Sequence, residues 1–238
     1  DQKKWNNSLK SFLSRLRWHC HFIQKLEDEP SLEFKPMNIM YEGLRQNFNP
    51  AYLNAWNKGE TGYPMVDASM RCLISTGWLN FRMRAMLVSF ACNNLWIDWK
   101  IVAENLGPLF VDYEPGIHYP QVQMQAGITG INTVRIYNPI KQGLDHDPNG
   151  LFIKRWVPEL KSTHKAIIHT PWLDQNNKYI IPIVDEAISR KAAADKIYEI
   201  RRRKDHREHS GRVLKKHGSR KRKSIQNNKI INNQLNLL

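Results

Sequence analysis

Two arginines interrupt one of the most apolar stretches of the chain. Arg82 and Arg84 lie within residues 79–95, where Met, Leu and Phe side chains recur at helical spacing. An arginine in such a stretch must reach solvent or meet an anion, because an unpaired buried guanidinium is energetically costly. The sequence therefore predicts a partner for these cations.

The cysteines predict neither a metal site nor a disulfide. Cys20, Cys72 and Cys92 are far apart, and their odd number without a CxxC pair argues against a disulfide framework or a zinc site. An iron–sulfur cubane usually takes four thiolates, and the chain has three. We interpret all three as thiols of the core and predict no metal.

The elements that position these side chains are predicted to be helices. Residues 5–26 place apolar side chains at steps of three and four, which is typical of an amphipathic helix. A structured loop rich in Gly, Pro and Gln is expected over 112–130. Neither a strand nor an internal repeat is predicted, so the fold class is all-α. Further helices are expected at 40–44, 50–56, 64–76, 79–95, 119–126, 152–157 and 185–203.

Length and charge predict one domain with a basic tail. The chain has 238 residues, of which 41% are hydrophobic, and no run approaches the roughly 20 apolar residues of a membrane span. With no apolar signal segment at the start, we expect a soluble, cytoplasmic protein. Residues 201–223 hold twelve Lys or Arg against two carboxylates, which is +10 of the net +14. We therefore divide the chain into a domain at 1–200 and a disordered tail at 201–238, which either attracts nucleic acid or only aids solubility.

Four sequence blocks carry a resemblance to a known family. They read RLRWH at 15–19, KGETGYPMVDA at 58–68, GWLNFRMR at 77–84, and RIYNP at 135–139 with WVPEL at 156–160. In this order and spacing they resemble the photolyase and cryptochrome family, over roughly residues 5–172. The resemblance implies an all-helical domain that cradles FAD, with a DNA-facing cavity above the cofactor.

The resemblance also implies which residues contact the flavin. Arg84 and Asp112 match an ion pair beside the isoalloxazine ring, which would supply the partner that Arg84 needs. Glu114 matches a second acidic residue near the flavin, and Trp78 matches a tryptophan of its pocket. His118 falls at the position that faces flavin N5, where a histidine can donate or accept a proton.

The implied DNA-facing residues surround the same cavity. Trp18 matches a tryptophan that packs against a flipped pyrimidine dimer, and such an aromatic platform stacks on bases of any sequence. The expected partner is damaged duplex DNA with flipped pyrimidines. The other positions implied at the cavity or its rim are Arg82, Gln123, Met124 and Arg135.

The chain also departs from the family at its repair residues. Arg15 stands where photolyases use a glutamate, Phe81 replaces an asparagine, and Met124 replaces a second cavity tryptophan. Of the three electron-relay tryptophans only the middle one is matched, by Trp99, because Val122 and Gln46 occupy the other two positions. Alternative routes could use Trp96, Tyr113 or Tyr119.

These observations leave three functions open. The leading hypothesis is blue-light-driven DNA repair, in which reduced FAD donates an electron to a flipped pyrimidine lesion. The departures favour a cryptochrome-like photoreceptor without repair activity, and the basic tail favours a light-independent nucleic-acid-binding module. The upstream antenna domain and phosphate-wrapping segment of the family are not in the sequence, so we expect a fragment that another chain could complete. The oligomeric state is not predicted.

Overall fold

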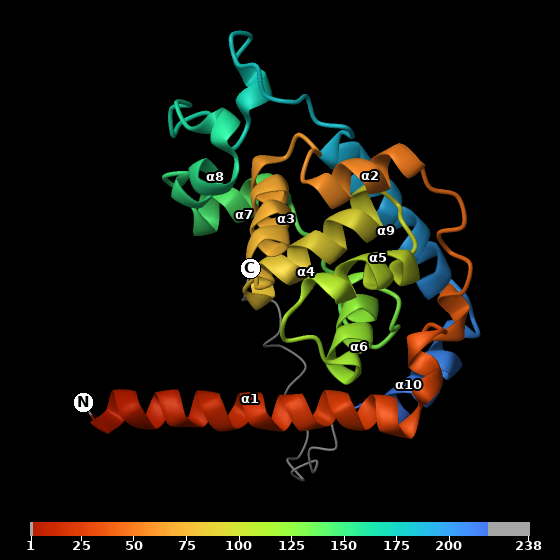
Figure 1. Ribbon diagram of the computed structural model, residues 1–238. Coiled ribbons are helices and arrows are strands. Elements are labelled where there is room, and N and C mark those ends of the chain that lie inside the picture. The colour runs from red at the N-terminus through yellow and green to blue at the C-terminus, as the bar shows by residue number, and fades with distance from the viewer. Residues whose placement is uncertain (1, 219–238) are drawn as a thin grey trace, which may run out of the picture.

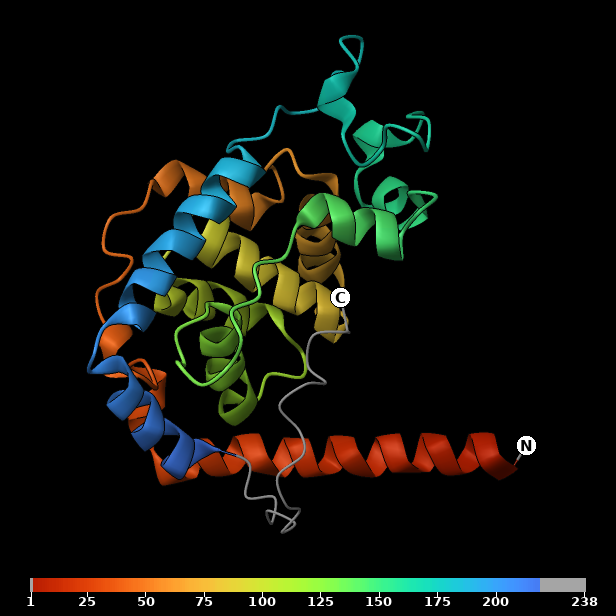
Figure 2. The same cartoon turned by 180° about the vertical axis from the view of Figure 1, so that it is seen from behind.

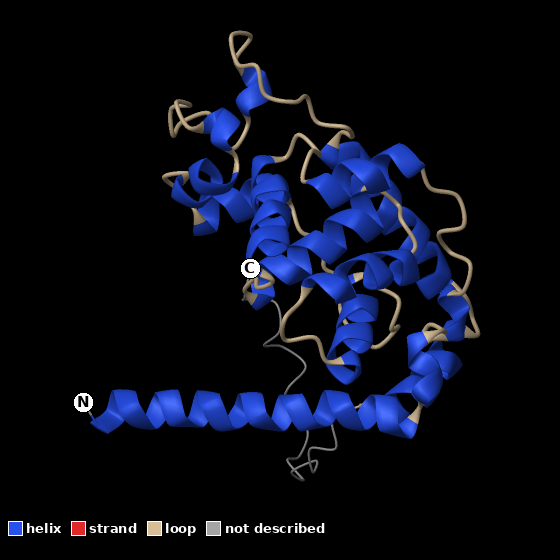
Figure 3. Ribbon diagram, viewed as in Figure 1, coloured by secondary structure: helices blue, strands red, loops and turns tan. Residues whose placement is uncertain are grey.

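The computed structural model describes residues 2–218, and every regular element within that range is a helix (Figure 1, Figure 3). The predicted all-α fold class is confirmed. No helix in this range is long and apolar enough to cross a membrane. The α-helices are α1 Gln2–Asp28, α2 Pro50–Lys58, α3 Pro64–Thr76, α4 Phe81–Ser89, α5 Trp99–Leu106, α6 Pro115–Gln125, α7 Pro139–His146, α8 Leu151–Trp156, α9 Glu186–Arg202 and α10 His206–His217. Short helical turns are η1 Pro30–Glu33, η2 Ile39–Tyr41, η3 Phe90–Asn94, η4 Gly107–Leu109, η5 Pro158–Leu160 and η6 Pro171–Leu173.

The residues from Met40 to Ile200 pack around one hydrophobic core, and we call this part of the chain the main body. Helices α3 and α4 form its centre (Figure 1). Helix α3 contacts α2, α4, α7 and α8, while α4 contacts α6. Gly77 ends α3 in the left-handed conformation, with φ of 69°, which a glycine adopts without steric cost. Asn80 then caps α4 by accepting a hydrogen bond from the Met83 backbone N–H. The chain therefore reverses within a few residues and sets the start of α4 beside the end of α3.

The sequence block at 58–68 serves the fold. The buried Asp67 carboxylate accepts hydrogen bonds from the Thr61 N–H and hydroxyl, both at 2.7 Å, and from the Gly62 N–H at 3.0 Å. The Tyr179 hydroxyl donates a fourth hydrogen bond at 2.6 Å. Asp67 thus holds the turn before α3 and ties it to a segment that lies far along the chain.

The predicted helix at 79–95 is divided in the structure. The α-helical part ends at Ser89 and continues as a π-helical turn, η3. Trp96 follows with a φ of 57° and is the one residue other than glycine with positive φ in the described part of the chain. Its ring centroid lies 4.7 Å from the Arg45 guanidinium and 4.4 Å from the Lys196 ammonium. These two cation–π contacts help to hold a backbone conformation that a bulky residue rarely adopts.

Helix α1 lies along the bottom of the molecule, and its N-terminal part extends beyond the main body (Figures 1 and 2). Its C-terminal part packs on α6 so closely that a Cβ on Gly116 would lie 2.8 Å from the Ile23 Cα. Farther from α6 the apolar face is uncovered, so the burial expected for an amphipathic helix is found only near its end. The same geometry leaves Cys20 exposed, which corrects its interpretation as a core thiol. The exposed large apolar residues of α1 are Trp5, Leu9, Phe12, Leu13, Leu16 and Trp18.

The start of the basic segment is folded, which corrects the expectation of disorder from residue 201. Helix α10 covers 206–217 and packs against η2 and α9. His206 shares a hydrogen bond of 3.0 Å with the Tyr41 hydroxyl, and His217 contacts the Glu29 carboxylate. Val213 completes the contact by packing with Leu32 and Met37. The rest of the predicted tail, 219–238, lies outside the described residues.

Acidification should detach α10 from the main body. Burial lowers the pKa of both His206 and His217, so protonation is less favourable in the folded state. Above the histidine pKa of the unfolded chain, about 6.5, both states hold a neutral imidazole and this contribution to stability is complete. As the pH falls below about 6.5, the unfolded chain binds the protons more readily than the folded one, so the free energy of unfolding decreases. Burial raises the pKa of Glu29, but hydrogen bonds from His217 and Lys216 outweigh it and lower the net value. The Glu29 contribution is therefore also lost toward acid, at lower pH. The other charged groups that face the two histidines are Lys25, Arg201, Asp205 and His209.

The measurement is amide hydrogen exchange at about pH 7.5 and about pH 5.5, corrected for the intrinsic pH dependence of exchange. Protection of α10 should fall in acid, while α3, which contains no histidine, should keep its protection. Equal protection of α10 at both pH values would contradict the expectation.

Candidate functional site

Arg84 has the anionic partner that the sequence predicted. Its Nη2 donates to the Asp112 carboxylate at 3.0 Å, and its Nε donates to the Leu79 carbonyl. The guanidinium also lies 4.2 Å from the centroid of the Phe110 ring. The Asp112 side chain is 50% exposed and that of Arg84 is 24% exposed, so the pair stands at the edge of an opening.

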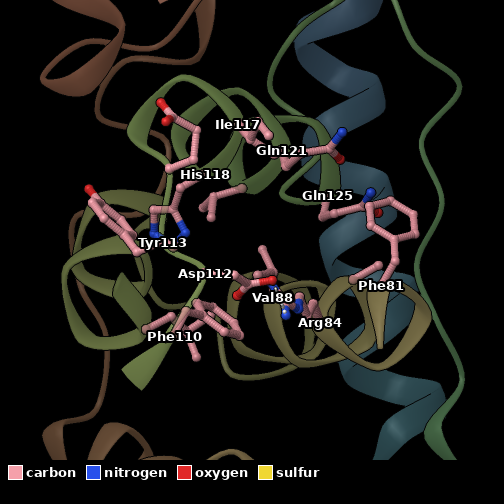
Figure 4. Close-up of a pocket in the computed structure, with 14 residues that line it drawn as sticks. Phe81, Arg84, Val88, Phe110, Asp112, Tyr113, Ile117, His118, Gln121 and Gln125 are labelled. Atoms are coloured by element: carbon pink, nitrogen blue, oxygen red, sulfur yellow. Dashed lines mark hydrogen bonds and ion pairs between the residues drawn. The ribbon is translucent and has the colours of Figure 1, made fainter. Parts of the chain in front are cut away.

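The Arg84–Asp112 pair lines a cavity of about 150 Å³ between α4, α5 and α6 (Figure 4). We call it the first cavity. Glu114 stands at its wall as the cap of α6, where its carboxylate accepts from the Gly116 N–H at 3.1 Å. The predicted flavin residues Arg84, Asp112, Glu114 and His118 are therefore brought together. The remaining lining residues are Phe81, Ala85, Val88, Leu106, Phe110, Tyr113, Ile117, Gln121, Val122 and Gln125.

His118 presents a neutral ring to the first cavity. Its Nε2 lies 2.9 Å from the Ala103 carbonyl, and since a carbonyl only accepts, Nε2 carries the proton. Burial lowers the pKa of His118, the hydrogen bond to the Ala103 carbonyl opposes this, and the nearby Arg84 charge lowers the pKa, so that its net shift is downward. The ring therefore stays neutral near pH 7 and keeps Nδ1 as a hydrogen-bond acceptor.

A second cavity, of about 610 Å³, adjoins the first between α1, α6 and the segment after α6. Four residues line both cavities: Phe81, Ile117, Gln121 and Gln125. Trp18 forms part of its aromatic wall, with its ring centroid 5.5 Å from that of Phe22. Arg15 and Arg135 add two cations, and no Asp or Glu of residues 2–218 lines this cavity.

Three predicted DNA-facing residues lie in the wall of the second cavity. Trp18, Met124 and Arg135 line it, as do Arg15 and Phe81, where the chain departs from the family. Arg82 is exposed on the first turn of α4 and lines neither cavity.

Gln123 and Trp78 require corrections. Gln123 is fully buried: its Nε2 donates to the Leu32 and Lys35 carbonyls, and its Oε1 accepts from the Met37 N–H. All its polar atoms hold the segment at 32–37, so the predicted DNA contact is wrong. Trp78 is 55% exposed and lines neither cavity, so the structure does not bring it to the predicted flavin site.

Trp99, the predicted electron-transfer residue, packs in the main core and lines neither cavity. Its role stays a prediction. Within residues 2–218 no group of three His, Cys, Asp or Glu side chains could hold a metal ion.

Sequence reasoning missed the residues of α6 that form the wall between the cavities. Ile117, Gln121 and Gln125 follow one another at steps of four, and Glu114 precedes them by three. Residues at this spacing share one face of a helix, so the pattern could have identified them once 115–125 was taken as helical. The Gly and Pro residues of this segment led instead to the prediction of a loop.

The cavities suit a ligand with an extended polar ring. The Gln121 Oε1 is buried without a hydrogen-bond partner, and Gln121 lines both cavities. A buried polar atom without a partner is costly, so a ligand donor would be favoured there. Arg84 and Asp112 add a charged donor and a charged acceptor, and apolar side chains enclose the remaining space.

Comparisons with known proteins agree with this geometry. Residues 12–199 match the family model described as the FAD binding domain of DNA photolyase. A deoxyribodipyrimidine photo-lyase of Alkalihalophilus pseudofirmus is 32% identical over 201 residues, which cover 78% of this chain and 42% of the relative. A cryptochrome DASH of Synechocystis is 40% identical over 169 residues, or 71% of this chain and 35% of the relative.

The same family appears among solved structures. An archaeal photolyase from Sulfolobus tokodaii, solved with two FAD molecules, superposes with a TM-score of 0.76 at 31% identity. The match covers 79% of this chain and 44% of that one. The chain therefore belongs to the photolyase and cryptochrome family, as an FAD-binding domain, and the cofactor of this domain is FAD. It spans less than half the length of the relatives described above.

Proposed function

We propose that this chain is the cofactor- and substrate-binding part of a light-driven DNA-repair flavoprotein. In this function an electron passes from reduced FAD in the first cavity to a pyrimidine lesion flipped into the second cavity. The observation that carries the proposal is the shared wall of Phe81, Ile117, Gln121 and Gln125, because ligands in the two cavities would be neighbours.

Each cavity has side chains suited to its ligand. When bound, FAD supplies light absorption and electron transfer. Arg84 and Asp112 would orient its polar edge, and the neutral His118 would offer Nδ1 as a proton acceptor. In the second cavity Trp18 would stack on a base, while Arg15 and Arg135 would attract its phosphates.

The repair assay uses the full chain with added FAD, reduced and illuminated with blue light. Oligonucleotides that contain a thymine dimer or a (6-4) lesion are the substrates. We expect light-dependent loss of one lesion and none in the dark. If flavin and DNA both bind but both lesions persist under light, the repair function is wrong.

A photoreceptor without repair activity is the second candidate. It is favoured by Arg15 in the second cavity, where the family's photolyases carry a glutamate that hydrogen-bonds the dimer. This candidate predicts that illumination changes the spectrum of the bound flavin and the binding of a partner while the lesions persist.

Trp18→Ala should weaken binding of lesion-containing DNA. Loss of one base–aromatic stack costs about 1–3 kcal/mol, which corresponds to an affinity lower by about 5- to 150-fold. The control is Trp5→Ala on the same helix, because Trp5 is 70% exposed and lines neither cavity. Binding is measured by fluorescence anisotropy with damaged and undamaged duplexes. Equal effects of the two substitutions would argue against a stacking role for Trp18.

A further inference from the structure

Helix α10 lies beyond the part of the chain that the family model matches. The match ends at residue 199, whereas α10 spans 206–217. Its contacts through His206, Val213 and His217 fix which side of the helix faces the main body. The opposite side is consequently fixed toward solvent.

The outward side of this segment is strongly basic. Four exposed cations have no carboxylate of residues 2–218 within salt-bridge distance: Arg203, Lys204, Arg207 and Lys215. Two other cations of the helix do have carboxylate partners. Arg212 pairs with Glu208 one turn earlier on the same helix, and the Lys216 Nζ lies 3.0 Å from the Glu29 carboxylate. The sequence after 218 contains Lys and Arg residues and no Asp or Glu, so it adds cations only.

This basic surface begins at the rim of the second cavity. The Arg201 Nη2 donates to the Asn132 carbonyl, and both Asn132 and Arg135 line that cavity. In Figure 2 α9, in blue, runs beside the green segment that follows α6 and turns into α10 near the C-terminal end of α1. Cations therefore continue from the cavity through Arg203 and Lys204 and over α10. Two exposed carboxylates interrupt them: Asp205, and Glu208, which Arg212 neutralises.

We propose that the outward face of α10 and the preceding loop, through Arg203, Lys204, Arg207 and Lys215, form a binding surface for the phosphates of a DNA backbone. Unpaired cations along a fixed surface release counterions when they contact a polyanion, and they do so regardless of base sequence. The surface adds affinity for any duplex, whereas the second cavity selects the lesion. The proposal depends on the proposed function only for the choice of DNA as the polyanion.

The test is a fourfold variant, Arg203→Gln, Lys204→Gln, Arg207→Gln and Lys215→Gln, in the full chain. Binding of an undamaged duplex is followed by fluorescence anisotropy across a series of salt concentrations. The slope of log affinity against log salt should become shallower by about 0.9 for each phosphate that the variant no longer neutralises, and affinity at low salt should fall by about tenfold or more. The matched control neutralises four exposed lysines elsewhere: Lys161, Lys165, Lys178 and Lys191.

The outcomes separate this proposal from the repair function. The fourfold variant should lose affinity for damaged and undamaged duplexes equally, whereas Trp18→Ala should reduce only the preference for damage. If the chain shows no repair activity but the fourfold variant still has the shallower salt slope, the DNA-binding surface is supported and only the repair function fails. If the fourfold variant keeps the wild-type slope, or matches the lysine control, the proposal is overturned. Circular dichroism and protection of α10 against hydrogen exchange establish that the variant is folded.

Discussion

Arg84→Met is expected to weaken FAD binding by about 10- to 150-fold. The substitution removes a charged donor worth about 1.5–3 kcal/mol, and this range corresponds to that loss of affinity. It also leaves the Asp112 carboxylate without the partner 3.0 Å away and removes the cation over Phe110. Methionine keeps much of the side-chain volume, so the apolar walls of the first cavity should stay in place.

Titration of the purified chain with FAD, followed by flavin absorption, measures this effect. Arg82→Met is the matched control, because Arg82 is two residues away on α4 but exposed and outside both cavities. Thermal unfolding without FAD separates a binding defect from a folding defect. The assignment of Arg84 to the cofactor is wrong if both variants bind FAD with wild-type affinity.

Of the substitutions proposed for this chain, Arg45→Met is expected to lower the free energy of unfolding the most. The Arg45 side chain is almost fully buried, at 2% exposure, and burial lowers the pKa of its guanidinium. Its Nε donates to the Cys92 carbonyl at 2.6 Å, and Nη2 donates to Asn93 Oδ1 at 2.9 Å and to the Ala126 carbonyl at 2.8 Å. Arg45 thereby connects the turn after η2 to η3 and to the end of α6.

Removing the guanidinium leaves three buried acceptors unpaired, each at a cost of about 1–3 kcal/mol, while relief of the buried charge offsets part of it. We expect a net loss of about 3 kcal/mol, which lowers the melting temperature by about 6–12 °C for a domain of this size. The measurement is denaturant and thermal unfolding of the chain without FAD.

Two further variants make the Arg45 test specific. Asn93→Ala removes one of the three acceptors, together with the hydrogen bonds that Asn93 Nδ2 donates to Ser89 Oγ and the Gln125 carbonyl, and should cost about 1–3 kcal/mol. Arg155→Met changes an exposed arginine whose guanidinium lies 5.3 Å from the centroid of the Trp156 ring, and it should alter stability by less than about 1 kcal/mol. A melting temperature of Arg45→Met equal to that of Arg155→Met would mean that the buried network does not stabilise the fold.

Local signals in the sequence were sufficient for much of the fold. The helix at 64–76 was predicted with its observed ends, because Pro64 suits the first turn and Gly77 suits the residue after the last. Helices α5 and α7 were not predicted. Each has only eight residues, which gives hydrophobic periodicity few positions in which to appear.

The site was predicted where the resemblance coincided with a local physical need. Arg84 lacked a local partner, and the structure supplies Asp112, which is 28 residues away. Gln123 lies in a similar sequence context to Gln121 and Gln125, yet it faces the η1 segment while they line the cavities. Which glutamine enters a cavity depends on the packing of α6 against α1 and α4, and sequence spacing alone does not contain that packing. Helix α10 was not predicted, because its buried side is narrow. Three histidines and many cations leave too few apolar residues on that side for a helical periodicity to appear in the sequence.

The two cations at Trp96 affect how electrons could move through the domain. Oxidation of an indole leaves a positive charge on the ring, and both Arg45 and Lys196 would repel that charge from less than 5 Å. The burial of Arg45 limits screening by water, so the repulsion is greater than it would be at an exposed site. Trp96 is therefore hard to oxidise, and a radical formed elsewhere in the domain would not come to rest on it.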